Sequence, residues 1–158
     1  MMCLVIDTGC IPKVFDPTNR EHGRFIPVWE WINSGRGYMI YGGTKYLTEL
    51  NRLSRYLRLI AELNRKGRLV IISKTQVDQV SVEIKQKINK SDLDDEHLMV
   101  IVIVSRCMVV CTDDLMAIPY LKMTDIYAGY HVKRPKIYCK LQHGSLCCDR
   151  NVRIPHGP

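Results

Sequence analysis

Four acidic residues at the ends of separate predicted elements indicate a metal-binding site. Asp7 directly follows the apolar run at the start of the chain, and Asp114 follows a second apolar run. Glu49 lies on a predicted long helix, and Asp95 lies where a later helix begins. Continuous apolar runs are typical of strands buried in a parallel sheet. Because parallel strands end at one edge of the sheet, where open α/β folds bind their ligands, we expect these carboxylates to converge.

Carboxylates are the ligands that Mg²⁺ and Mn²⁺ prefer, and both cations also bind substrate phosphates. Such a cation polarises a phosphoryl oxygen, lowers the pKa of an attacking water and stabilises the leaving oxygen. The expected chemistry is therefore phosphodiester hydrolysis without a covalent nucleophile. The hydroxyls of Thr8 and Thr112 could orient an acid or a water, although either could simply satisfy a strand end.

The segment 91–97 carries more acids than the start of a helix requires. Capping and the helix dipole favour one or two acids at such a position, but this segment contains Asp92, Asp94, Asp95 and Glu96. Their mutual repulsion raises their pKa values and weakens the helix start unless a cation neutralises them. The cluster therefore supports Asp95 as a metal ligand.

The net charge of the chain indicates a polyanionic partner. The formal charge is +7, with the basic residues concentrated in residues 45–90 and 133–153. A basic surface attracts nucleic-acid phosphates and offsets their repulsion by an acidic centre, although solvated helix faces equally explain the lysines and arginines. The residues that we expect to contact nucleic acid are Lys45, Arg52, Lys74, Lys133 and Arg134.

Predicted strands and helices alternate along the chain, which favours an α/β fold with a parallel sheet. The clearest helix starts at Thr44, where apolar residues recur at helical spacing until Gly67. A right-handed crossover places the strand before Asp114 beside the first strand. The predicted strands are 2–6, 38–41, 69–72, 108–111 and an edge strand within 133–141, and the predicted helices are 44–66, 73–88 and 91–104.

Three segments in this order resemble the PIN-domain family. They are Leu4-Val5-Ile6-Asp7-Thr8, then Ser91-Asp92-Leu93-Asp94-Asp95-Glu96-His97-Leu98, and finally Val109-Val110-Cys111-Thr112-Asp113-Asp114. The second matches a family pattern of Asp, any residue, His and an apolar helix, and the third matches an apolar strand that ends in Thr, Asn, Asp. The resemblance covers roughly residues 3–121.

The resemblance implies an αβα sandwich with a central parallel sheet. It also implies a Mg²⁺- or Mn²⁺-dependent endoribonuclease, often the toxin of a toxin–antitoxin pair or of a defence system. Asp7, Asp95 and Asp114 fill three acidic positions of the family, and Asp113 stands where the family often has Asn. For the fourth acid, Glu49 ranks first, because residues 42–50 resemble a segment of some PIN-like proteins. Asp78 ranks second, because residues 73–80, where the family usually has a Glu, contain none.

A chain of 158 residues is long enough for one core and short for two domains. We predict a PIN-like nuclease domain over residues 1–124 and a basic extension over 125–158 that packs on it or trails it. No apolar stretch approaches the ~18 residues of a membrane span, which favours a cytoplasmic protein. RNA is the expected partner and an antitoxin protein a further one, while a homodimer stays open.

Other interpretations fit parts of the sequence. The strongest is a catalytically silent PIN-like module that binds RNA or protein. A phosphate-accepting receiver domain would need an acidic pair on the first strand, where only Asp7 is present. Asp7-Thr8-Gly9 imitates the aspartic protease signature, but that fold is all-β. His143 with Cys139, Cys147 and Cys148 could hold zinc, although their spacing is poor for a zinc site.

Overall fold

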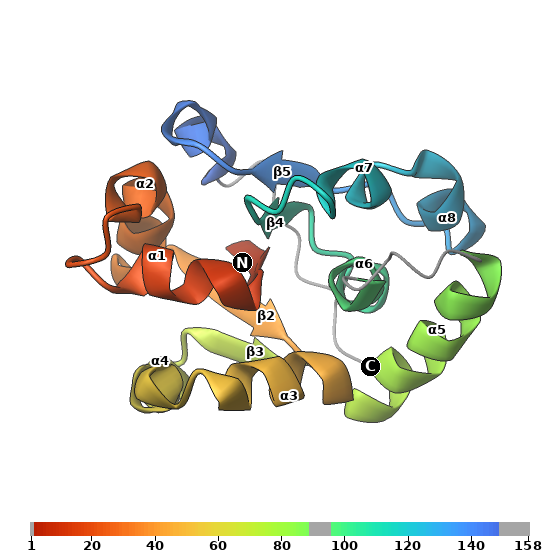
Figure 1. Cartoon of the computed structure of the whole chain (residues 1–158), viewed down its shortest axis with the longest axis horizontal. Coiled ribbons are helices and arrows are strands. Elements are labelled where there is room, and N and C mark those ends of the chain that lie inside the picture. Colours follow the sequence, from red (N-terminus) through yellow and green to blue (C-terminus); the bar gives the residue numbers. More distant parts are fainter. Residues whose placement is uncertain (1, 89–95, 149–158) are drawn as a thin grey trace.

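The computed structural model describes residues 2–88 and 96–148, and its centre is a parallel sheet (Figure 1). Five strands pair in the order β3-β2-β1-β4-β5. Their bounds are β1 Met2–Ile6, β2 Gly37–Tyr41, β3 Leu69–Ile71, β4 Val109–Cys111 and β5 Lys136–Tyr138. All pairs are parallel, so the carboxyl ends of all five strands lie on one edge, as the sequence predicts.

The central position of β1 follows from its composition. The side chains of residues 3–6 are at most 1% exposed, because β1 has a neighbour on each side and helices above and below. In the register of β1 and β4, Val5 is opposite Val110 and Ile6 is opposite Cys111. The predicted placement of the strand before Asp114 beside the first strand is confirmed.

Helices cover both faces of the sheet (Figure 1). The helices α1 (Ile11–Phe15) and α2 (His22–Asn33) lie on one face, and α6 (Glu96–Ser105) lies on the other, where it contacts β1 and β2. Residues 98–103 of α6 are all buried, as expected of a helix that is apolar on every side. The fold is the αβα sandwich that the sequence predicts.

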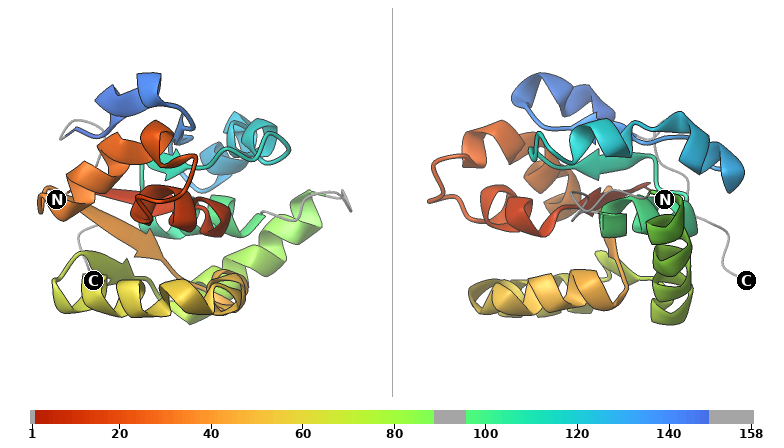
Figure 2. Two further views of the ribbon diagram at one scale, coloured as in Figure 1. Left: turned by 60° about the vertical axis from the view of Figure 1, so that its left-hand side comes forward. Right: turned by 45° about the vertical axis from the view of Figure 1, so that its right-hand side comes forward.

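The predicted helix over 44–66 is wrong in one respect, because the chain breaks it into two helices. α3 (Thr44–Arg52) ends at Leu53, whose ψ of 50° is not helical, and a 3₁₀ turn at Ser54–Tyr56 leads into α4 (Leu57–Arg65). The two helices follow one another along one side of the molecule (Figure 2). Tyr46 of α3 is fully buried, whereas Leu47 of α3 and Leu57 of α4 are exposed.

The segment from residue 7 to residue 27, for which no strand or helix is predicted, contains α1 and the first half of α2. Its prolines and glycine are typical of loops. Pro12 occupies the first turn of α1, where a missing N–H costs little. Pro27 lies inside α2, and burial of Phe25, Trp31 and their apolar neighbours stabilises the helix nevertheless.

The remaining elements complete the two helical layers. α5 (Lys74–Lys87) packs against α6, and α7 (Ile118–Leu121) and α8 (Thr124–Gly129) lead to β5. β5 pairs with β4 as the predicted edge strand, and the 3₁₀ helix Leu141–Leu146 contacts α2. Residues beyond the predicted boundary at 124 therefore pack on the same sheet. Among the helices that the structure describes, none has the length and apolar character to span a membrane.

Candidate metal centre

Asp7 lies at the carboxyl edge of the sheet, directly after β1, and is 8% exposed. The register of β1 and β4 places Thr112 beside it, and the buried Thr112 hydroxyl donates a 2.7 Å hydrogen bond to Asp7 Oδ2. Burial raises the pKa of Asp7, and the charges of Glu49 and Asp114 act in the same direction. The Thr112 hydroxyl and His97 oppose this shift without cancelling it, so further positive charge nearby would favour ionisation of Asp7.

Glu49 reaches the same place from α3. The Thr8 hydroxyl donates a 2.8 Å hydrogen bond to Glu49 Oε2, which orients the carboxylate. Burial by itself would raise the pKa of Glu49, but contacts with His97, Thr8 and Lys45 outweigh burial and lower it. Glu49 is therefore held as the anion.

His97 approaches from α6 and is 2% exposed. Its Nε2 lies 3.1 Å from Glu49 Oε2, but the angles of this contact are not those of a hydrogen bond. Within residues 2–88 and 96–148, neither ring nitrogen of His97 has a hydrogen-bond partner. The ring of Tyr46 meets the His97 ring edge-on, with centroids 6.2 Å apart, and the Tyr46 hydroxyl donates to the carbonyl of Ile6.

These three side chains form a cluster that could hold a metal ion. Asp7, Glu49 and His97 each offer one ligand atom, and the three atoms lie within 4.8 Å of one another. The sequence predicts Asp7 and Glu49 for this site but misses His97 as a ligand. A signal was present, because His97 is the one ionisable residue after Glu96 in an otherwise apolar helix.

Asp114 lies near this cluster without belonging to it. Its backbone N–H donates a 3.2 Å hydrogen bond to the Thr112 hydroxyl, and its Oδ1 accepts one from the N–H of Met116. The charge of Asp114 contributes to the raised pKa of Asp7. Asp114 therefore adds negative charge beside the cluster.

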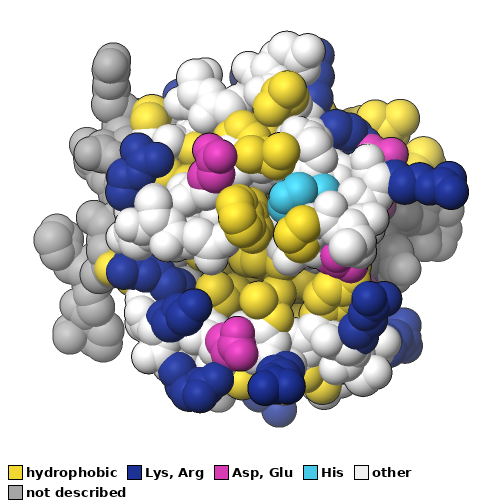
Figure 3. Space-filling view, turned by 90° about the vertical axis from the view of Figure 1, so that its left-hand side faces the viewer, with side chains coloured by type: hydrophobic (Ala, Val, Ile, Leu, Met, Phe, Trp, Pro, Cys, Tyr) yellow, Lys and Arg dark blue, Asp and Glu magenta, His cyan; other side chains and the backbone are white. Residues whose placement is uncertain are grey.

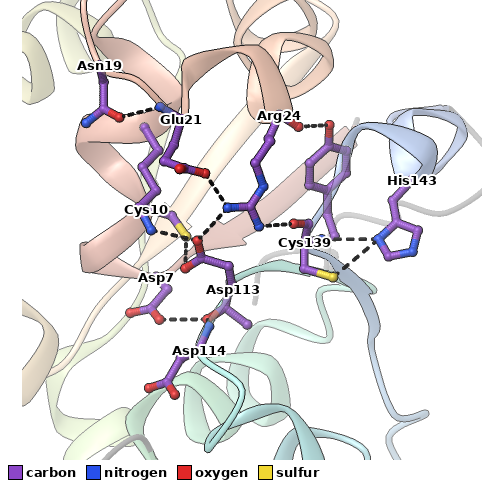
Figure 4. A network of polar contacts seen from close by, with 12 residues as sticks. Asp7, Cys10, Asn19, Glu21, Arg24, Asp113, Asp114, Cys139 and His143 are labelled. Atoms are coloured by element: carbon purple, nitrogen blue, oxygen red, sulfur yellow. Dashed lines mark hydrogen bonds and ion pairs between the residues drawn. The ribbon is translucent and has the colours of Figure 1, made fainter.

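Asp113 turns to a separate network of polar contacts (Figure 4). Its carboxylate contacts Lys13 Nζ at 2.6 Å and Arg24 Nη1 at 3.4 Å. Arg24 also pairs with Glu21 and donates to the carbonyl of Cys139 at 2.9 Å. Asp113 thus ties the end of β4 to α1, α2 and the end of β5, which is a structural role.

Asp78 lies on α5, apart from the cluster, and its carboxylate contacts the first residue of α3. It accepts hydrogen bonds from the backbone N–H and the hydroxyl of Thr44, at 2.8 and 2.6 Å, and these bonds lower its pKa. Gly43 precedes the helix with a φ of 90°, a conformation that favours glycine. Of the two candidates for the fourth acid, the structure brings Glu49 to Asp7 and uses Asp78 to cap a helix.

The predicted ligand Asp95 lies outside the described residues, as do Asp92 and Asp94. Their neighbour Glu96 is 2% exposed, and its carboxylate contacts Lys45 Nζ at 3.1 Å and Lys85 Nζ at 3.5 Å. Two lysines thus neutralise this buried acid. The Lys45–Glu96 contact also joins α3 to α6, the helices that carry Glu49 and His97.

The other predicted nucleic-acid contacts lie on the surface. Arg52, Lys74, Lys133 and Arg134 are exposed, whereas Lys45 is engaged with Glu96. On the face that includes α1, α2 and α4, lysine and arginine side chains surround an apolar area that contains few acids (Figure 3). This distribution suits a polyanion.

The cysteines and His143 do not form a second metal centre in the part of the chain that is described. Cys139 Sγ lies 3.7 Å from His143 Nδ1, but no third ligand atom joins them in a cluster of metal-binding geometry. All seven cysteines fall in described positions, and none forms a disulfide.

No protein-family model, curated protein or solved structure matches this chain.

Proposed function

We propose that this chain is a divalent-metal-dependent endoribonuclease that hydrolyses RNA phosphodiester bonds at the Asp7–Glu49–His97 cluster. The observation that carries the proposal is the convergence of these residues from β1, α3 and α6 at the carboxyl edge of the sheet. The Asp7 and Glu49 carboxylates each accept a hydrogen bond from a threonine hydroxyl, and both also face a buried imidazole that lacks a hydrogen-bond partner among the described residues. A cation beside two such carboxylates favours their ionised forms.

The side chains around the cluster support this chemistry. A bound Mg²⁺ or Mn²⁺ would activate a water and polarise a phosphoryl oxygen. Thr112 and Thr8 hold one oxygen each of Asp7 and Glu49, so both carboxylates are oriented in advance. Asp114 is near enough to raise the pKa of Asp7 and could accept a hydrogen bond from the attacking water.

RNA is the substrate that the charge and the PIN resemblance favour. The net charge of +7 and the exposed basic side chains attract a phosphate backbone. The ordered PIN-like motifs extend the proposal to a cytoplasmic toxin that an antitoxin protein inhibits. In that case, expressing the wild-type chain arrests growth, and expressing the Asp7→Asn variant does not.

Incubation of the purified chain with mixed RNA tests the activity. We expect cleavage with Mn²⁺ and none with a chelator, and we expect Asp7→Asn to abolish cleavage. Asp125→Asn is the matched control, because Asp125 is an exposed acid on α8. RNA that is bound but left intact with every divalent metal would reject the nuclease and support the silent binding module.

A further inference from the structure

His97 makes the candidate metal centre different from a site built of oxygen ligands alone. Its imidazole is 2% exposed, and both ring nitrogens lack hydrogen-bond partners within the described residues. A buried polar group without a partner costs free energy, in proteins typically about 1–3 kcal/mol. A ligand that the ring nitrogen can bind would recover that cost.

The surroundings of His97 hold its ring toward the acids. Nε2 lies 3.1 Å from Glu49 Oε2, and the Tyr46 ring packs against the imidazole. The Tyr46 hydroxyl is itself bound to the carbonyl at the end of β1, directly before Asp7. Nε2 is therefore the ring nitrogen of His97 that contacts the Glu49 carboxylate.

The donor set decides between cation classes. Mg²⁺ demands nearly ideal octahedral oxygen coordination and keeps several waters, whereas imidazole suits first-row transition metals. We infer that the centre binds a first-row transition-metal dication of the Mn²⁺, Fe²⁺, Co²⁺ or Zn²⁺ type in preference to Mg²⁺, with His97 Nε2 as a nitrogen ligand beside Asp7 and Glu49. The inference rests on the metal site of the proposed function.

Thermal unfolding of the whole chain with single metals tests the preference. We expect Mn²⁺ and Co²⁺ to raise the melting temperature at concentrations at least about tenfold below those that Mg²⁺ requires, since binding to the folded state alone stabilises it. In His97→Gln, Mn²⁺, Co²⁺ and Mg²⁺ should all raise the melting temperature at similar concentrations. His131→Asn is the matched control, because His131 is exposed and its φ of 56° is one that Asn tolerates.

Pulsed electron paramagnetic resonance of the Mn²⁺-loaded chain tests the ligand directly. We expect coupling of the metal to a ¹⁴N nucleus in the wild type and in His131→Asn, and no such coupling in His97→Gln. The wild-type spectrum decides the question even if the His97 variant fails to fold. Absence of nitrogen coupling, or equal stabilisation by Mg²⁺ and Mn²⁺, would overturn the inference.

The two proposals can fail separately. If Mn²⁺ binds through nitrogen but no metal supports RNA cleavage, the inference stands and the proposed nuclease is rejected. If Mg²⁺ and Mn²⁺ support cleavage equally and no nitrogen coupling appears, the nuclease stands and His97 is a core residue beside the site.

Discussion

His97 Nε2 lies 3.1 Å from Glu49 Oε2, although Glu49 belongs to α3 and His97 to α6. The contact combines a buried ring with a carboxylate whose pKa is lowered. Asp7 completes the cluster with a pKa shifted in the opposite direction. Ionised Asp7 therefore lowers the stability of the metal-free fold, whereas ionised Glu49 raises it. Melting curves of single variants can distinguish the two effects.

Asp7→Asn should raise the melting temperature of the metal-free protein at neutral pH. Burial raises the pKa of Asp7 above 3.8, so the folded state binds this proton more tightly than the unfolded chain does. Ionising Asp7 therefore costs stability as the pH rises from 3.8 through the raised pKa, and the whole cost is present above it. Melting curves from pH 3 to 8 in a chelator should show the two proteins converging in acid. A variant less stable than wild type at pH 7 would contradict the raised pKa.

Glu49→Gln should lower the metal-free melting temperature at neutral pH. The pKa of Glu49 is below 4.5, so its ionised form contributes stability that is present above pH 4.5 and lost as the pH falls through the lowered pKa. The same series of melting curves should show this difference shrinking in acid. Stabilisation by Glu49→Gln at neutral pH would mean that repulsion from Asp7 outweighs the contacts with His97 and Thr8.

Mn²⁺ should raise the melting temperature of the wild type but not that of Asp7→Asn or Glu49→Gln. Binding to the folded state adds about 2.7 kcal/mol when the metal is a hundredfold above its dissociation constant. Asp78→Ala is the control: it removes the cap of α3 and should cost about 1 kcal/mol. Calorimetry should nevertheless show that Mn²⁺ raises the melting temperature of Asp78→Ala by as much as that of the wild type. Equal Mn²⁺ shifts in wild type and Asp7→Asn would argue against a single cation site.

Thr112→Val should destabilise the fold by about 1 kcal/mol and weaken metal binding. Valine has the same shape but leaves Asp7 Oδ2 and the Asp114 N–H without their hydroxyl partner. Chemical denaturation measures the stability, and titration with Mn²⁺ measures the affinity. Thr48→Val on α3 is a matched control, because the Thr48 hydroxyl bonds only its own helix in the contacts described. Unchanged Mn²⁺ affinity in Thr112→Val would show that Asp7 keeps its orientation without this bond.

Lys45→Met should cost about 1–3 kcal/mol, because it deprives the buried Glu96 of its closer lysine. It should also weaken Mn²⁺ binding, since Lys45 and Glu96 connect the helices of Glu49 and His97. Adding Glu96→Gln should recover part of the stability in a double-mutant cycle. If both single variants bind Mn²⁺ like wild type, the pair does not position the metal centre.

The parallel sheet and the strand ends at its carboxyl edge could be predicted from the order of apolar runs and acids along the chain. An apolar run such as residues 3–6, once it forms a strand, is buried in the middle of a parallel sheet, and the acid that follows it then lies at the carboxyl edge. That reasoning correctly placed Asp7 at the edge and β4 beside β1. It did not distinguish Asp113 from Asp114, because both acids follow the same apolar run. In the structure, Asp113 pairs with Lys13 and Arg24, while Asp114 lies near Asp7.

Which side chains meet depends on how the helices pack, and local sequence patterns do not contain that information. Glu49 and Asp78 are both acids on helices that contact each other, and the packing of α3 brings Glu49 to Asp7 while Asp78 caps α3. Tyr46 is buried beside His97, which helical periodicity alone did not indicate. A local pattern reports which residues are apolar, whereas the position of His97 against Glu49 depends on how α3 and α6 pack against each other.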